Sequence, residues 1–124
     1  HTMSHLVEIQ TQVTSEVAVQ AACRRLRLAP AVQETVTLYS ATASGLAVRL
    51  PGWRYPLVCD LANGSIRYDN FEGAWGATRE LDAFGQAYAV ERATLEARCR
   101  GHWVSETMLA DGSVKLTLRV GGAA

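Results

Sequence analysis

The stretch from Thr78 to Val120 restricts the fold most, because it joins a long helical pattern to two alternating stretches. At 100° per residue, five apolar residues fall on one narrow arc: Leu81, Phe84, Tyr88, Leu95 and Cys99. We therefore expect a helix over 79–100 that packs this face against a sheet.

Both ends of the expected helix carry recognisable signals. Thr78 is suited to the N-cap position, where its hydroxyl can accept a hydrogen bond from a free amide of the first turn. Gly101 is suited to the left-handed residue that ends a helix. Gly85 breaks the pattern, since glycine inside a helix costs roughly 1 kcal/mol relative to alanine. We expect another backbone to approach closely at Gly85.

The residues after the helix predict a hairpin. Stretches 102–109 and 113–120 flank Asp111-Gly112, a pair that favours a tight turn with positive φ. Apolar and polar residues alternate strictly over 113–120. We expect one buried and one solvated face.

The remaining residues predict one more helix and five more strands. Alternation indicates strands at 6–13, 32–39, 46–50, 55–61 and 65–70, with turns at Ser44-Gly45 and Asn63-Gly64. A helix capped by Thr14 or Ser15 is expected to run to about Leu28. The predicted class is α+β, a mainly antiparallel sheet with two helices on one face. We compare it with a ferredoxin-like sandwich variant of order β-α-β-β-β-β-α-β-β.

Composition describes one ordinary globular domain. His1-Thr2 before Met3 resembles a cloning scar, so residues 3–124 are expected to form the single domain. Twelve basic and twelve acidic residues cancel, and no basic stripe is visible, so nucleic acid is disfavoured as a partner. No apolar run approaches the length of a membrane span, which predicts no membrane association and a cytoplasmic location.

The cysteines and histidines give no firm site. Cys23, Cys59 and Cys99 form no CxxC pair, and the first and last fit apolar helix faces. We expect reduced, structural thiols, no metal and no cofactor. His5 and His102 begin terminal strands and could meet, but two histidines without a carboxylate at fixed spacing are a weak metal signal. We identify no catalytic residue.

Aromatic residues and glycines alternate just before the long helix, over 68–76. Trp53, Phe71 and Trp75 lie in or beside turn-rich segments, and exposed together they would form a hot spot for a protein partner. The competing interpretation is that Trp75 closes the core beneath the helix N-terminus, since large aromatic side chains dominate core burial.

Glu91 and Arg92 border the apolar arc of the long helix. One interpretation is that both extend past the apolar stripe to solvent. The other is that they form a charged pair at the rim of a pocket between the helix and the sheet.

Several short motifs resemble the hypothetical chloroplast reading frame thirty-five family, a domain of unknown function from cyanobacteria, plastids and other bacteria. The matching segments are Met3-Ser4-His5, Ile9-Gln10-Thr11-Gln12-Val13, Gln86-Ala87-Tyr88-Ala89, Gly101 through Val104, Asp111-Gly112-Ser113 and Leu116-Thr117-Leu118-Arg119. Family members carry an aromatic and a polar residue after the Tyr-Ala pair, where this chain has Val90, Glu91 and Arg92. The resemblance implies a small intracellular protein without established catalytic residues.

Two functions compete on this basis. The favoured one is a small, soluble accessory protein that binds a protein partner through the aromatic loop or a sheet edge, with homo-oligomerisation left open. The alternative is a small-molecule-binding protein or an enzyme with a pocket between the long helix and the sheet, bordered by Glu91 and Arg92. The sequence favours a non-enzymatic role.

Overall fold

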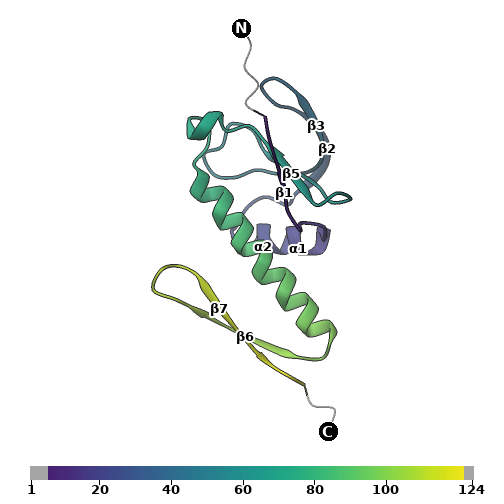
Figure 1. Cartoon of the computed structure of the whole chain (residues 1–124), viewed down its shortest axis with the longest axis vertical. Coiled ribbons are helices and arrows are strands. Elements are labelled where there is room, and N and C mark those ends of the chain that lie inside the picture. Colours follow the sequence, from purple (N-terminus) through teal and green to yellow (C-terminus); the bar gives the residue numbers. More distant parts are fainter. Residues whose placement is uncertain (1–5, 122–124) are drawn as a thin grey trace.

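The structure, a computed structural model, describes residues 6–121, which form an α+β fold with two helices and two antiparallel sheets (Figure 1). The elements in chain order are β1 (Val7–Gln10), α1 (Glu16–Arg25), β2 (Val32–Thr37), β3 (Thr42–Val48), β4 (Leu57–Asp60), β5 (Ser65–Tyr68), the 3-10 turn η1 (Phe71–Gly73), α2 (Thr78–Cys99), β6 (Trp103–Met108) and β7 (Val114–Arg119). Apart from η1, strands and helices follow one another along the chain as expected.

The larger sheet has the strand order β1-β5-β4-β3-β2, and every neighbouring pair is antiparallel. The two outer strands are therefore β1 and β2. The C-terminal strands β6 and β7 form a separate two-stranded sheet. The ferredoxin-like arrangement is not confirmed, because the last two strands do not join the main sheet.

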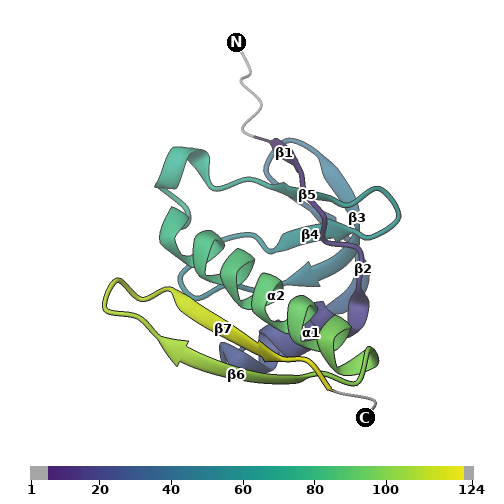
Figure 2. The ribbon, with the colours of Figure 1, turned by 60° about the horizontal axis from the view of Figure 1, so that its bottom comes forward.

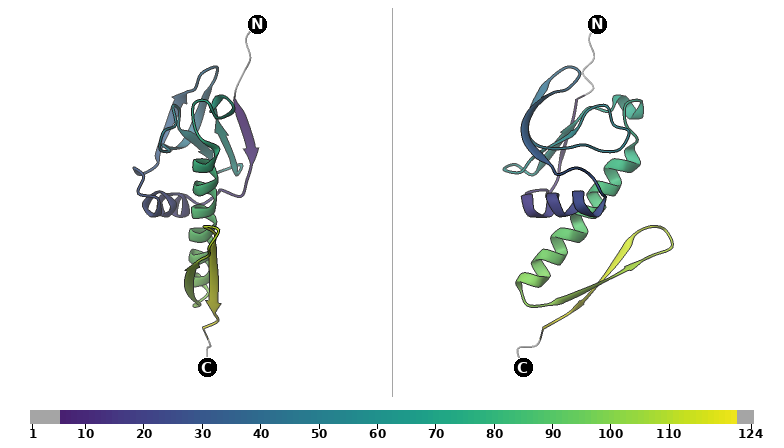
Figure 3. Two further views of the ribbon diagram at one scale, coloured as in Figure 1. Left: turned by 90° about the vertical axis from the view of Figure 1, so that its left-hand side faces the viewer. Right: turned by 180° about the vertical axis from the view of Figure 1, so that it is seen from behind.

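Both helices pack on one face of the larger sheet. Cross-strand register aligns Ile9 with Ile66, Ile66 with Cys59, and Cys59 with Leu46, so one apolar row crosses four strands. Residues of both helices complete this core: Ala18, Val19, Ala22 and Cys23 from α1, and Phe84, Ala87 and Tyr88 from α2. In Figure 3, α1 lies below the sheet, and α2 runs from the level of the sheet to below it.

A second, smaller core lies around the curled β2–β3 hairpin. Leu38, Ala43 and Val58 are buried in it. The turn of this hairpin is closed by a hydrogen bond from the Leu38 amide to the Ala41 carbonyl at 2.7 Å. The predicted turn at Ser44-Gly45 is wrong, because both residues lie inside β3. The glycine at position 45 is explained by close packing, because a Cβ there would lie 2.4 Å from the Cys59 carbonyl oxygen.

Only the N-terminus of α1 lies where the sequence predicted it. The Ser15 hydroxyl accepts a hydrogen bond from the Ala18 amide at 3.2 Å, which confirms Ser15 as a predicted N-cap. The helix ends at Arg25, earlier than the expected Leu28. It cannot continue because Arg27 has a left-handed φ of 58°.

The N-terminus of α2 lacks the predicted cap. Ala77 occupies the N-cap position and Thr78 is the first helical residue, so the N-cap residue has no side chain that could accept a hydrogen bond from a first-turn amide. The predicted C-terminus is confirmed: Gly101 has a φ of 77°, and the His102 amide bonds the Ala97 carbonyl at 2.9 Å.

The predicted apolar face of α2 is correct except at its end. Phe84 and Tyr88 are buried, and Leu81 and Leu95 pack against the main core. Cys99 is exposed, contrary to the prediction. The reason is length, because this helix of 22 residues extends past the sheet (Figure 1).

The β6–β7 hairpin lies along α2, apart from the main sheet (Figure 2). Arg25 at the end of α1 binds Glu106 of β6 through two hydrogen bonds of 2.8 and 2.6 Å. The Gln86 side chain donates to the Gly112 carbonyl at the hairpin turn. Burial of the expected apolar face is only partial, since Leu118 remains 55% exposed.

Candidate functional site: a groove between α2 and the edge strand β1

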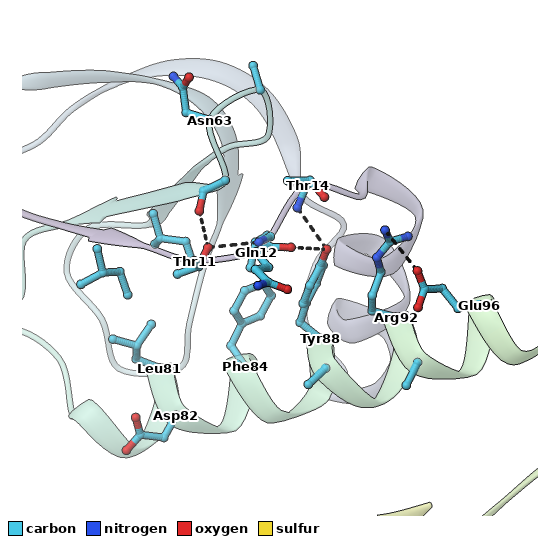
Figure 4. A pocket seen from close by; sticks show the side chains of 18 residues that line it. Thr11, Gln12, Thr14, Asn63, Leu81, Asp82, Phe84, Tyr88, Arg92 and Glu96 are labelled. Atoms are coloured by element: carbon cyan, nitrogen blue, oxygen red, sulfur yellow. Dashed lines mark hydrogen bonds and ion pairs between the residues drawn. The ribbon is translucent and has the colours of Figure 1, made fainter. Parts of the chain in front are cut away.

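A groove of about 940 Å³ separates α2 from β1 and the β4–β5 turn (Figure 4). Its apolar lining consists of Ile9, Val13, Ile66, Leu81, Phe84 and Tyr88. Polar residues border it on both sides: Thr11, Gln12, Thr14 and Asn63 from the sheet, and Asp82, Arg92 and Glu96 from α2. Apolar walls with a few polar groups are typical of binding sites.

Small residues widen the groove on the helix side. Gly85, Ala89 and Ala93 recur at intervals of four residues, so they form one strip along α2. A Cβ at Gly85 would have no heavy atom within 4 Å. The expected approach of another backbone to Gly85 is therefore wrong for the described chain, and the space beside this residue belongs to the groove.

The Tyr88 hydroxyl ties the end of β1 to α2 at the back of the groove. It donates to the Gln12 carbonyl at 3.2 Å and accepts from the amides of Thr14 and Ser15 at 3.1 and 3.2 Å. Figure 4 shows the ring rising from α2 toward Gln12 and Thr14. This contact fixes the distance between the two walls at one point.

One wall of the groove is an outer strand of the main sheet. Because β1 pairs only with β5, its other backbone edge has no strand beside it within residues 6–121. The β4–β5 turn extends this pairing, since the Thr11 amide bonds the Gly64 carbonyl at 2.7 Å. The strand β1 thus contributes side chains to one wall of the groove, and its outer edge carries backbone groups that can pair with another strand.

The two predicted rim residues point to different places. Arg92 lines the groove and forms a loose ion pair with Glu96 at 3.7 Å. Glu91 does not line it, and instead binds Arg25 of α1 at 3.0 Å. Arg92 and Glu91 therefore do not act as a pair, because neighbouring residues of a helix face directions about 100° apart.

The aromatic loop forms a cluster around Trp75. Its ring centroid lies 4.7 Å from that of Phe71, 5.1 Å from Tyr39 and 5.8 Å from Tyr55. The Arg54 guanidinium lies 4.9 Å from the Trp75 ring centre. Phe71 and Trp75 are thus brought together as the sequence suggested, with Phe71 39% exposed and Trp75 partly buried.

Trp53, the third predicted partner-binding residue, lies apart from this cluster. Its ring packs on Gly76, where a Cβ would come within 2.4 Å of the indole. Its indole N–H donates to the Ala77 carbonyl at 3.0 Å, and its ring meets Tyr68 edge-on at 5.6 Å. Trp53 therefore anchors the loop before α2 to the main core.

The described residues contain no group of three or more His, Cys, Asp or Glu side chains that could hold a metal ion. His5 lies outside the described residues, and the His102 Nδ1 accepts a hydrogen bond from the Gly121 amide at 3.2 Å. Neither α1 nor α2 is long and apolar enough to cross a membrane.

The thiols are buried at two of three positions. Cys23 and Cys59 lie in the main core as free thiols. Burial raises the pKa of the Cys59 thiol to about 12, and it also raises the pKa of Cys23. Both groups are held in the protonated, unreactive form at neutral pH.

Sequence reasoning missed the sheet side of the groove. Thr11, Gln12 and Asn63 were assigned only to a strand and a turn, because strand order cannot be read from alternation. The spacing of Gly85, Ala89 and Ala93 was the one available signal, since it leaves an open strip on a helix that otherwise carries larger side chains.

Comparisons with family models, curated proteins and solved structures give no match for this chain. The family resemblance drawn from the sequence motifs stays a prediction.

Proposed function

We propose that this protein is a small accessory module that binds an extended segment of a partner protein in the groove between α2 and β1. The observation that carries the proposal is that the groove is lined in part by β1, an outer strand with no second partner strand among residues 6–121. The proposal keeps the interaction role favoured by the sequence, in the cytoplasm, and of the two expected sites, the aromatic loop and a sheet edge, it takes the sheet edge.

The binding mode is strand addition. A partner segment beside β1 would form main-chain hydrogen bonds with the strand, and every second side chain would point toward the helix. Ile9 and Leu81, which are both partly exposed, provide apolar surface beneath those side chains, and the buried Phe84 lies behind them. Because Gly85 and Ala89 carry little or no side chain, a partner backbone can lie close to α2.

The apolar lining and the bordering charges of the groove indicate which kind of segment can bind there. An extended segment with alternating apolar side chains fits the apolar lining. Asp82 borders the groove near the start of α2, and Arg92 and Glu96 border it further along (Figure 4). These exposed or half-exposed charges favour polar residues at both ends of the bound segment.

A small organic molecule is the second candidate occupant. The cavity volume of about 940 Å³ lies within the range of about 300–1,000 Å³ found for small-molecule sites. Arg92 would then provide a guanidinium for an anionic group on the molecule. This candidate keeps the pocket between the long helix and the sheet that the sequence suggested, with Arg92 but not Glu91 at its rim.

A variant that fills the groove tests the proposal. Gly85→Leu introduces a side chain into the open space and also raises helix propensity, so the fold is retained. Peptides selected from a random display library against the native chain should bind it and lose at least about tenfold in affinity, or about 1.4 kcal/mol, with Gly85→Leu. Arg79→Leu, on an exposed part of α2 outside the groove, is the matched control and should bind normally.

The same variants separate the two occupants. Native mass spectrometry of the chain purified from cell extract would reveal a retained small molecule. A retained molecule that Gly85→Leu removes, together with failure to select any peptide at the groove, would favour the small-molecule site over strand addition.

A further inference from the structure

The C-terminal hairpin packs along α2 but leaves several large apolar side chains exposed to solvent. Trp103, Met108, Leu118 and Val120 are between 55% and 72% exposed. A two-stranded sheet is marginally stable in water, and both of its outer edges carry unpaired backbone groups. Among residues 6–121, no third strand pairs with β6 or β7.

The two edges of the hairpin are not equivalent. The strand β6 is held to α1, because Glu106 receives two hydrogen bonds from Arg25. Among the described residues, no side chain of β7 makes a hydrogen bond or ion pair to α1, α2 or the larger sheet. The Arg119 guanidinium instead lies over the Trp103 ring of the same hairpin. The edge of β7 is therefore the less restrained of the two.

The β7 sequence suits pairing with itself across a two-fold axis. In such a pair, two copies of one strand run antiparallel beside each other, related by the two-fold axis. The apolar faces of the two hairpins lie on the same side of the joined sheet only if the axis passes through a residue, so that this residue lies opposite its own copy. An axis at Lys115 would place two lysines opposite each other. An axis at Thr117 would place Lys115 opposite Arg119 of the other copy. Both registers oppose like charges, which is unfavourable.

An axis at Leu116 avoids these charge contacts and uses the whole strand. It pairs Lys115 with Thr117 and Val114 with Leu118, so the apolar side chains of both copies form one continuous row. An axis at Leu118 also avoids opposed charges, but it reaches beyond the end of β7 at Arg119 and pairs fewer strand residues. Leu116 is thus the favoured centre.

We propose that β7 is a self-association edge, through which two copies of this chain join their hairpins into one four-stranded antiparallel sheet centred on Leu116. The exposed Leu118 of each copy is covered by Val114 of the other. None of the residues that line the α2–β1 groove belongs to the hairpin, so this edge and the groove are separate surfaces.

Sedimentation equilibrium tests the association itself. The native chain should form a species of twice its 13.4 kDa mass, and Leu118→Lys should return it to the monomer. Val17→Lys, at a similarly exposed apolar residue on α1, is the control that should leave the dimer intact. A native chain that stays monomeric up to its solubility limit overturns the proposal, as does a dimer that survives Leu118→Lys in a folded protein.

Disulfide trapping tests the register. In a Cys99→Ser background, which removes the exposed native thiol, Leu116→Cys should give a covalent dimer under mild oxidation because the two introduced thiols lie opposite each other. A cysteine at position 115 or 117 lies opposite the same position of the other copy only if the axis passes through that residue. Lys115→Cys and Thr117→Cys should therefore cross-link far less. Faster cross-linking at either of those positions than at Leu116→Cys overturns the Leu116-centred pairing.

Discussion

The hydroxyl of Tyr88 donates a hydrogen bond to the carbonyl of Gln12 at 3.2 Å, and so joins the middle of α2 to the end of the β1 segment. It also accepts hydrogen bonds from two amides at the start of α1. A single side chain thus satisfies three backbone groups at the point where the first strand leaves the sheet. This contact keeps the groove open at a fixed width.

Removing this hydroxyl should cost stability. Tyr88→Phe keeps the ring in the core but leaves the carbonyl of Gln12 and two amides without their partner. We expect a loss of about 1–3 kcal/mol in the free energy of unfolding, measured by chemical denaturation. Tyr55→Phe, whose hydroxyl makes no hydrogen bond within the described residues, is the control. Equal losses in the two variants would show that the Tyr88 contact contributes nothing specific.

Phe84 tests the orientation of α2. It is fully buried between the helix and the larger sheet, so Phe84→Ala should cost about 3–5 kcal/mol of unfolding free energy. Arg79→Ala on the exposed face should change stability by less than about 0.5 kcal/mol. A loss below about 1 kcal/mol for Phe84→Ala would mean that another face of α2 meets the sheet.

The clamp between Arg25 and Glu106 predicts acid sensitivity of the hairpin. The hydrogen bonds from Arg25 hold the pKa of Glu106 below its ordinary value of 4.5. The folded state therefore keeps Glu106 ionised where the unfolded state protonates it, and the stabilisation present at neutral pH is lost as pH falls through the folded pKa. Because both side chains are about one-third exposed, the effect should be within about 0.2–1 kcal/mol.

Glu106→Gln supplies the comparison for this clamp. Its melting temperature should fall less than that of the native chain between neutral pH and pH values below 4.5. Glu80→Gln, which removes a carboxylate of α2 that bonds only loosely to Arg79 at 3.8 Å, should follow the native curve. A native-like acid curve for Glu106→Gln would contradict the role assigned to the clamp.

Burial of Cys59 predicts alkaline destabilisation. Its pKa rises from 9.0 to about 12 in the folded state, so the unfolded thiol loses its proton first. The unfolded state then binds fewer protons, and stability falls between these two pH values by at most about 1.4 kcal/mol per pH unit from this group. Cys59→Ala should show a shallower fall over the same range. Identical slopes in urea titrations would show that the Cys59 thiol is accessible to solvent.

Local patterns predicted most of the elements of this fold. Side-chain alternation and the Asn63-Gly64 and Asp111-Gly112 pairs located the β4–β5 and β6–β7 hairpins, because turn chemistry and strand period are encoded over a few residues. The burial of Phe84 and Tyr88 followed from helical spacing alone. The turn prediction at Ser44-Gly45 was wrong because Gly45 is required by close packing against the backbone of β4 and not by a turn. No local pattern reveals such a contact.

Long-range arrangement could not be predicted in the same way. The position of β1 at the edge of the sheet depends on its pairing with β5, nearly sixty residues later in the chain. The groove follows from that edge, so its sheet side could not be found from sequence. The ion pair of Glu91 with Arg25 depends likewise on where α1 lies relative to α2.

Hydrogen exchange at β1 tests the central claim most directly. Deuterium uptake would be followed by mass spectrometry for the native chain with and without a library-selected peptide. Strand addition predicts slower exchange at Val7–Gln10, because amides on its free edge gain partners, and slower exchange across 85–93 of α2. Unchanged exchange in β1, with protection around Trp75 or along β7 instead, would contradict the groove as the binding site.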